Sequence, residues 1–287
     1  MIRRGPLGRL GLVVLFGALF AYLILPVVAV LLYSLATRWT QHILPDGYTL
    51  THWQVTFANP RIVAAFLRSI GLATAAVVLD ILLVVPAVYW SRVRNRRIRP
   101  VLEVAAAIPF ALPYLVVAFG ILTLFGNGPT GPITAKLINT PFLLAFGHAA
   151  IAFPFLYWAV DGAMAAADVE GLSEAAETCG ATSVQIIRRV VAPNITPGLV
   201  AGGILVFATS LGEFAMVQLL AGGGFETVPL FQADALQATV GRLDELAVTT
   251  FVTFVILFVL SAGVVYFNRG RVIQALITAE TLRREKP

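Results

Sequence analysis

The chain alternates between long apolar blocks and short polar connections. Each of six blocks reaches the ~20 residues that a helix needs to cross the hydrocarbon core of a bilayer. These blocks run from about 10 to 33, 66 to 90, 104 to 125, 141 to 160, 195 to 221 and 246 to 267. The pattern predicts an all-α membrane protein with six transmembrane helices, in a single domain that covers residues 1–287. Pro109 and Pro113, near the start of the third block, predict a kink there.

The composition supports a membrane protein, because 59% of the residues are hydrophobic and only 12% are charged. A soluble domain carries roughly 25% charged residues. The first block is longer than the roughly 7–15 apolar residues of a secretory signal, so we predict a retained span. The net charge of +5 does not indicate a nucleic-acid partner, because the basic residues lie between the apolar blocks and not along one face of a soluble domain.

The basic residues also predict the orientation, since cytoplasmic connections carry an excess of Lys and Arg. Most of them lie before the first block, after the second and fourth blocks and after the sixth. The other side carries only Arg38, Arg61, Arg68, Lys136 and Arg242. Both termini are therefore predicted to be cytoplasmic. We interpret the arginine-rich segment 92–99 as a topology anchor that contacts lipid headgroups.

The connection 161–194 carries the clearest local signals. Its sequence predicts a short helix from Ser173 to Cys179, with the serine as the N-terminal cap. Gly180 is suited to the left-handed conformation that ends a helix. Thr182 and Gln185 form a T-x-x-Q capping box, which predicts a second helix. The connection is therefore expected to fold as a helix–turn–helix at the membrane surface.

The two predicted helices of this connection differ in character. Glu170, Glu174 and Glu177 recur at helical spacing and form an acidic face. The second helix carries an apolar patch formed by Ile186, Ile187, Val190 and Val191. Such a unit either docks in a groove of a soluble partner or lies on the lipid surface. Acidic side chains are unfavourable next to anionic headgroups, which favours docking.

A spaced motif in the same connection resembles a known family. Glu174-Ala175-Ala176 is followed after three positions by Gly180, after nine more by Val190, and then by Ala192-Pro193. This resembles the EAA loop, EAA-x3-G-x9-I-x-L-P, of permeases of binding-protein-dependent ATP-binding-cassette (ABC) importers. Val190 replaces the usual Ile, and Ala192 replaces the usual Leu and removes an apolar contact. The resemblance covers nearly the whole chain, because span number and orientation also match a type I importer permease.

The resemblance implies a role and a set of partners. The loop would be a coupling helix that sits in a cleft of an ATPase, with contacts from Glu174, Ala175, Ala176 and Gly180. We assign Glu170 and Glu177 of the acidic face to the same contact. The implied partners are two ATP-binding cassette subunits, a second permease (identical or homologous) and an extracytoplasmic substrate-binding protein. The implied location is the bacterial inner membrane. ATP and Mg²⁺ would be bound by the cassette subunits, and no cofactor by this chain.

The sequence contains no ATPase motif or catalytic constellation of its own. The phosphate-binding loop G-x-x-x-x-G-K-[ST] is absent, since neither Lys136 nor Lys286 follows a glycine. The run Gly222–Gly224 is interpreted as a turn. His148 stands alone in its block, so we assign no metal site, and no nucleophile is paired with a base. We therefore predict a transport subunit and not an enzyme.

Polar residues inside the apolar blocks are candidates for the translocation path. Glu213 lies within the fifth block, where an ionisable residue usually faces the bundle interior or an aqueous cavity. On a continuous helix it would share a face with Thr209 and Ser210. The alternative is a structural hydrogen bond to a neighbouring helix. For Asp80 in the second block we expect a helix-pairing role.

Two segments bear on the substrate. The first loop carries Trp39, Ile43, Leu44, Pro45, Gly47, Thr49 and Leu50, and the fifth block carries Leu211-Gly212-Glu213. Both resemble permeases for polyamines, ferric iron and 2-aminoethylphosphonate, and they favour the phosphonate members. The first loop would help to dock the binding protein. A stand-alone secondary transporter is the alternative of another class, although the inverted repeats of that class are not seen, and a membrane enzyme is a third.

Overall fold

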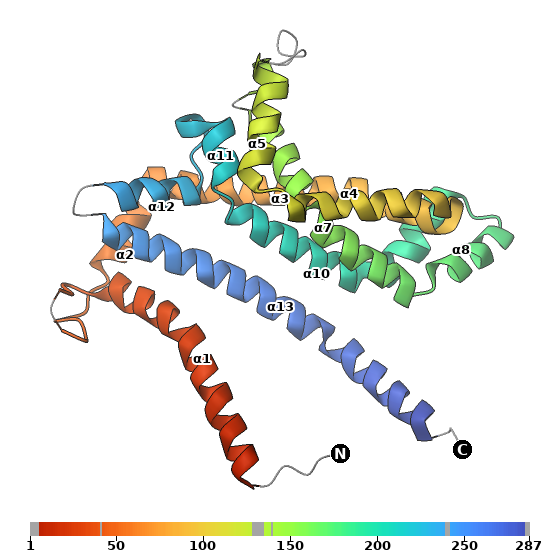
Figure 1. Cartoon of the computed structure of the whole chain (residues 1–287), viewed down its shortest axis with the longest axis horizontal. Coiled ribbons are helices and arrows are strands. Elements are labelled where there is room, and N and C mark those ends of the chain that lie inside the picture. Colours follow the sequence, from red (N-terminus) through yellow and green to blue (C-terminus); the bar gives the residue numbers. More distant parts are fainter. Residues whose placement is uncertain (1–5, 41, 128–134, 139, 239–241, 285–287) are drawn as a thin grey trace. The chain divides into compact units, whose positions relative to one another are not determined.

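The computed structural model describes residues 6–40, 42–127, 135–138, 140–238 and 242–284. Its named elements are helical, and Ala36 and Tyr48 form an isolated bridge. The α-helices are α1 (Pro6–Leu35), α2 (Thr51–Ala58), α3 (Pro60–Tyr89), α4 (Arg99–Ala111), α5 (Tyr114–Leu122), α7 (Pro141–Ala166), α8 (Val169–Thr178), α9 (Ser183–Ile186), α10 (Ala192–Leu211), α11 (Ala215–Leu220), α12 (Val228–Gln237) and α13 (Leu243–Arg284) (Figure 1). The π-helical turns are η1 (Trp90–Arg94), η3 (Thr123–Asn127) and η5 (Ile187–Val191), and the 3₁₀ turns are η2 (Arg96–Ile98), η4 (Ala135–Leu137) and η6 (Gly222–Phe225).

The predicted spans are confirmed with two corrections. Within the described residues five helices are long and apolar enough to cross a membrane, and a sixth span results if α4 and α5 are counted together. These two helices are bent by 103°, so the predicted kink is a full break. Pro113 has no N–H to continue the helix, and it forces Leu112 into an extended conformation (φ −106°, ψ 130°). Arg3, Arg4 and Lys286, which contributed to the predicted orientation, lie outside the described residues.

The fifth predicted span is also interrupted. α10 ends at Leu211, and α11 begins at Ala215 after a three-residue break. Glu213 lies in this break. The prediction that Glu213 sits in the middle of a continuous helix is therefore wrong, and it does not share a helical face with Thr209 and Ser210.

The chain forms two compact units. Unit 1 comprises residues 1–63 and 232–256, and unit 2 comprises residues 64–231 and 257–287. In unit 1, Trp53 Nε1 donates to Ser34 Oγ at 3.2 Å, and the Asp234 carboxylate accepts from Arg61 at 2.8 Å and Arg242 at 2.9 Å. Hydrogen bonds from Arg242 and Arg61 lower the pKa of Asp234 below its usual value, so this carboxylate is ionised at neutral pH.

Unit 2 is built around the α7–α10 pair, whose helices lie side by side in Figure 1. Gly198 and Gly202 of α10 form a small-residue G-x-x-x-G pair of the kind that lets membrane helices approach closely. A Cβ atom on Gly198 would lie 2.6 Å from the Ala159 carbonyl oxygen of α7. One on Gly202 would lie 2.8 Å from Leu156 Cδ1. The two backbones therefore meet with no room for a side chain.

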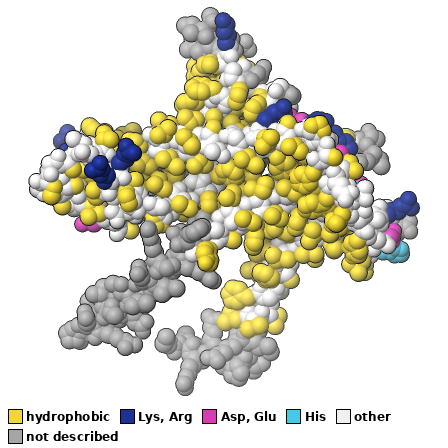
Figure 2. Space-filling model, turned by 180° about the vertical axis from the view of Figure 1, so that it is seen from behind, with side chains coloured by type: hydrophobic (Ala, Val, Ile, Leu, Met, Phe, Trp, Pro, Cys, Tyr) yellow, Lys and Arg dark blue, Asp and Glu magenta, His cyan; other side chains and the backbone are white. Residues whose placement is uncertain are grey.

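The outer surface is largely apolar. In Figure 2 hydrophobic side chains cover much of the coloured part of the face, and the charged side chains gather in small groups. Within unit 2, Leu82, Val101 and Phe119 are 65%, 65% and 62% exposed. A soluble monomer rarely exposes apolar patches of this extent, so these faces suit lipid or a neighbouring membrane chain.

Replacing Gly198 with alanine should disrupt the α7–α10 contact, because the added methyl meets backbone that cannot move away. We expect a loss of about 1–3 kcal/mol, typical of overpacking, seen as a lower melting temperature of the detergent-solubilised protein. Gly203→Ala is the matched control on the same helix, since its Cβ would lie 3.5 Å from Val77 in ordinary contact. Equal melting temperatures for the two variants would contradict this close packing.

Candidate functional site

The connection 161–194 folds as a helix, a turn and a second helix, but its boundaries differ from those predicted. Its first residues complete α7, and α8 begins at Val169. The N-terminal cap is Asp168 (φ 47°), which accepts from the Gly171 amide and tolerates the left-handed conformation. The prediction of Ser173 as the cap is therefore wrong. Ser173 is fully buried, and its hydroxyl donates to the Val169 carbonyl at 2.6 Å.

The turn after α8 agrees with the local signals in the sequence. Gly180 has a φ of +79°, and no atom lies within 4 Å of the position of its missing Cβ. The capping box is present, since Thr182 N donates to Gln185 Oε1 at 2.8 Å and Gln185 N donates to Thr182 Oγ1 at 3.4 Å. The second helix continues through the π turn η5 into α10. The turn at Gly180 is thus exposed and set by its own residues.

The predicted acidic face of α8 is divided. Glu170 and Glu177 are half-buried and lie next to arginines of the segment 92–99. Glu174 and Ala175 are exposed, and Glu174 has no ion pair or hydrogen bond from its side chain within the part of the chain that the structure describes. Ala176 is half-buried against the apolar core. The exposed side of α8, which carries Glu174 and Ala175 together with Leu172 and Thr178, is therefore open to another molecule.

The predicted apolar docking patch is wrong, because its residues face the interior of unit 2. Ile186 and Val191 are fully buried in the core cluster that includes Val88 and Tyr157, and Ile187 and Val190 pack against the same cluster. The second helix runs directly into α10, so its apolar side continues the side of α10 that packs inward.

The arginine-rich segment 92–99 forms ion pairs with acidic residues of α7 and α8. Arg92 is buried, and its Nε lies 2.7 Å from Oδ1 of Asp161 at the end of α7. Arg99 reaches the other oxygen of Asp161 at 3.4 Å, and Arg94 Nη2 lies 2.7 Å from Glu177 Oε1. The interpretation as a lipid-headgroup contact is corrected for Arg92, because its side chain is buried, and stays a prediction for Arg94 and Arg99. Sequence reasoning missed the pairs, although Arg92 and Asp161 each border an apolar block.

The residues predicted to line the translocation path lie around the break between α10 and α11. Ser210 and Glu213 are buried, and Glu213 Oε2 accepts from the Met216 amide at 2.8 Å. His148 was expected to stand alone, but it has two polar neighbours. Its Nδ1 lies 2.6 Å from Ser210 Oγ, and its Nε2 lies 4.0 Å from Glu213 Oε2. Thr209 is half-exposed and donates to the Leu205 carbonyl. The assignment of Thr209, Ser210 and Glu213 to the path stays a prediction.

The helix-pairing role expected for Asp80 has no hydrogen bond to support it. Its side chain is 1% exposed, and Oδ2 has no hydrogen-bond partner among the described residues. The described residues also contain no group of three or more His, Cys, Asp or Glu arranged to hold a metal ion.

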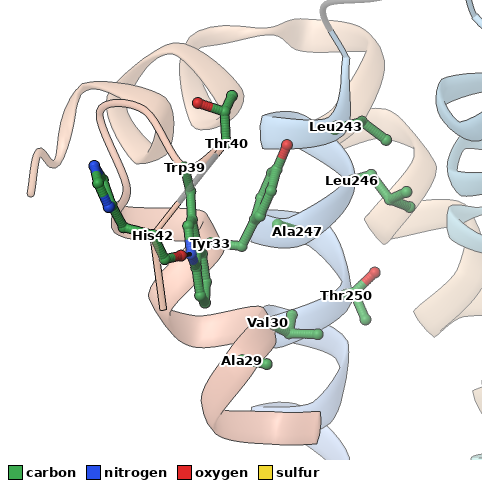
Figure 3. Close-up of a pocket in the computed structure, with 10 residues that line it drawn as sticks. All are labelled: Ala29, Val30, Tyr33, Trp39, Thr40, His42, Leu243, Leu246, Ala247 and Thr250. Atoms are coloured by element: carbon green, nitrogen blue, oxygen red, sulfur yellow. Dashed lines mark hydrogen bonds between the residues drawn. The ribbon is translucent and has the colours of Figure 1, made fainter. Parts of the chain in front are cut away.

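A cavity of about 610 Å³ lies in unit 1, between the end of α1, the loop after it and the start of α13 (Figure 3). Trp39 Nε1 donates to the His42 carbonyl at 2.9 Å, and the rings of Tyr33 and Trp39 are 6.1 Å apart. The lining residues are Ala29, Val30, Tyr33, Trp39, Thr40, His42, Leu243, Leu246, Ala247 and Thr250. The walls are mostly apolar.

Residues 83–274 match the family model of the binding-protein-dependent transport system inner membrane component. The sulfate transport system permease protein CysT of Salmonella typhimurium is 32% identical over 206 residues, which covers 70% of each chain. The molybdenum transport system permease protein ModB of Mycobacterium tuberculosis is 36% identical, covering 60% of this chain and 68% of its own. The putative 2-aminoethylphosphonate permease PhnV of Salmonella typhi is 28% identical, covering 80% and 85%.

Solved structures show the same fold. A bacterial ABC transporter involved in the import of the acidic polysaccharide alginate gives a TM-score of 0.61 at 18% identity, covering 96% of this chain and 99% of that chain. The MetNI methionine ABC transporter gives 0.55 at 16% identity, covering 74% and 98%. Together with the apolar helices, the matched model shows that the chain belongs to the binding-protein-dependent transport system inner membrane components, as a multi-pass permease subunit of an ABC importer in the bacterial inner membrane.

Proposed function

We propose that α8 is the coupling helix of this permease and docks on an ATP-binding cassette subunit at the cytoplasmic face. The observation that carries this proposal is the exposed pair Glu174 and Ala175. The inward side of α8 is occupied by buried Val169 and Ser173 and by ion pairs of the chain's own acids. The Glu174 carboxylate has no partner among the described residues, and a methyl side chain at position 175 allows close approach of another surface.

A coupling helix must be firm along its length and able to turn at its end. Asp168 caps α8, and its buried residues hold it, so a force applied by a partner to its exposed side displaces the helix as a unit. Gly180 provides a turn in open space, where the chain can bend toward α10 without a clash. Movement of the cassette subunits would thus be carried to the spans. ATP and Mg²⁺ belong to those subunits, because this sequence has no phosphate-binding loop.

The remaining partners follow from the same proposal. A second permease, identical or homologous, would supply a second coupling helix, so that two cassette subunits are engaged. An extracytoplasmic binding protein would deliver the solute and dock partly on the first loop, within which Trp39 Nε1 donates to the His42 carbonyl. Thr209, Ser210 and Glu213 remain the proposed lining of the path.

The substrate we propose is a small oxyanion, with 2-aminoethylphosphonate as the first compound to test. The relatives named above serve sulfate, molybdenum and 2-aminoethylphosphonate. Sulfate and molybdate are tetrahedral oxyanions, and the phosphonate group has a tetrahedral phosphorus with three oxygens, so all three present negatively charged oxygens around a tetrahedral centre. The phosphonate relative also matches over the largest share of both chains. None of the named relatives supports the polyamine or ferric-iron alternative.

Docking of α8 predicts a specific cross-link. The native thiol of Cys179 is exposed, so it is first replaced by serine, and Ala175→Cys then carries a short photo-activated cross-linker in the assembled transporter. We expect capture of the ATP-binding cassette subunit, identified by mass spectrometry. Leu236→Cys on α12 is an exposed control. Absence of the cassette subunit from the Ala175 adducts, in a complex that still contains it, would contradict docking at α8.

The turn at Gly180 predicts a second, mechanical effect. Gly180→Leu forces a branched side chain into a left-handed conformation at a strain of about 1–2 kcal/mol, so α8 should tilt away from its docking position. We expect uptake per ATP hydrolysed to fall about five- to tenfold in proteoliposomes. Gly180→Asn is the control, because asparagine tolerates positive φ. Unchanged coupling in Gly180→Leu would remove the turn from the mechanism.

The substrate proposal predicts a transport phenotype. Deletion of the gene in its bacterial host should abolish high-affinity uptake of labelled 2-aminoethylphosphonate, and the wild-type gene should restore it. Labelled sulfate, molybdate and putrescine are measured in the same strains. Loss of sulfate or molybdate uptake alone would keep the oxyanion class and change the compound, whereas loss of putrescine uptake alone would refute the class.

A further inference from the structure

Ion pairs connect α8 to the segment that follows α3, and the docking of α8 does not use them. At the C-terminal end of α8, Arg94 Nη2 lies 2.7 Å from Glu177 Oε1 and donates to Ser183 Oγ of α9 at 3.1 Å. At the N-terminal end, Arg92 Nη1 lies 3.4 Å from Glu170 Oε1. Arg92 and Arg94 both belong to the π turn η1, a distortion that is frequent at functional sites. Both ends of α8 are therefore tied to one turn.

The arginines that pair with the two ends of α8 differ in burial. Arg92 is also paired with Asp161, and the side chains of these two residues are only 7% and 10% exposed. Removing one partner of a buried pair leaves an uncompensated charge, so this pair keeps η1 fixed on α7. The side chains of Arg94 and Glu177 are 38% and 36% exposed. An ion pair with that exposure contributes little to stability, so its effect lies in where it holds α8.

The C-terminal end of α8 has few other attachments. Thr178, Cys179 and Gly180 are exposed, and Ala176 is half-buried. Among the described residues, this end is connected to the rest of unit 2 by the packing of Ala176 and, past the turn at Gly180, of Ala181 against the core, and by the Arg94–Glu177 pair. The turn alone allows α8 to tilt, whereas the pair joins it to η1 and thereby to α3.

We propose that Arg94 and Glu177 are positioning residues of the coupling step. They make α8 move together with the end of α3, so that a displacement of α8 reaches α3 through the ion pair and α10 through the chain. This inference rests on the proposed docking of α8 on an ATP-binding cassette subunit. The buried Arg92–Asp161 pair keeps η1 in place on α7, and the more exposed Arg94–Glu177 pair joins η1 to the C-terminal end of α8.

The test uses the complete transporter in proteoliposomes, with uptake per ATP hydrolysed as the readout. The variants are Arg94→Gln, Glu177→Gln and the charge swap Arg94→Glu with Glu177→Arg. Arg97→Gln is the matched control, because it removes the same charge from the same segment, and the Arg97 side chain is exposed without an ion pair in the described structure. We expect about a threefold loss of uptake per ATP in each single variant, recovery in the swap and no loss in the control.

The cross-link at position 175 separates the two proposals. If the parent transporter shows no capture of the cassette subunit, the docking proposal fails. If capture persists in every variant and Arg94→Gln behaves like Arg97→Gln, docking stands and the positioning role is overturned. If a single variant no longer captures the cassette subunit, the positioning role is supported when the charge swap restores capture. It is overturned when the charge swap does not restore capture.

Discussion

The ion pair between Arg92 and Asp161 is the interaction on which the arrangement around α8 depends. Two charges removed from water cost several kcal/mol each unless their geometry and remaining hydrogen bonds compensate. Here the two side chains meet at 2.7 Å, and Arg99 reaches the second oxygen of Asp161 at 3.4 Å. The pair joins the turn that ends α3 to the last residues of α7. Since α8 begins a few residues later, this pair sets where α8 starts.

The chemistry of α8 follows from that placement. Its inner side faces buried apolar residues and the arginines of the segment 92–99, so Glu170 and Glu177 form ion pairs within the chain. Its outer side keeps Glu174 and Ala175 exposed. One short helix thus separates residues that position it from residues that can meet a partner. The EAA-like motif contains the exposed Glu174 and Ala175 and the inward-packed Ala176, and its spacing does not distinguish the two kinds.

The break between α10 and α11 obeys a related constraint. An interrupted helix leaves backbone amides without carbonyl partners, and where these are buried they must be satisfied inside the protein. Glu213 supplies an acceptor to the Met216 amide, and His148 and Ser210 surround it with further polar groups. The acid that looked like a lining residue therefore also stabilises the broken helix. Its burial and its polar neighbours have a structural explanation whether or not solute passes near it.

The sequence by itself determined the features that depend on neighbouring residues. Span number followed from block length, and the positive φ of Gly180 and the Thr182–Gln185 capping box followed from residues a few positions apart. Only the tertiary structure decided which charges pair, because Arg92 and Asp161 are 69 positions apart and no local pattern connects them. The same reason turned the patch around Ile186 inward and placed Ser173 inside α8. Short-range backbone chemistry is encoded locally, whereas burial and ion pairing depend on which helices the fold brings together.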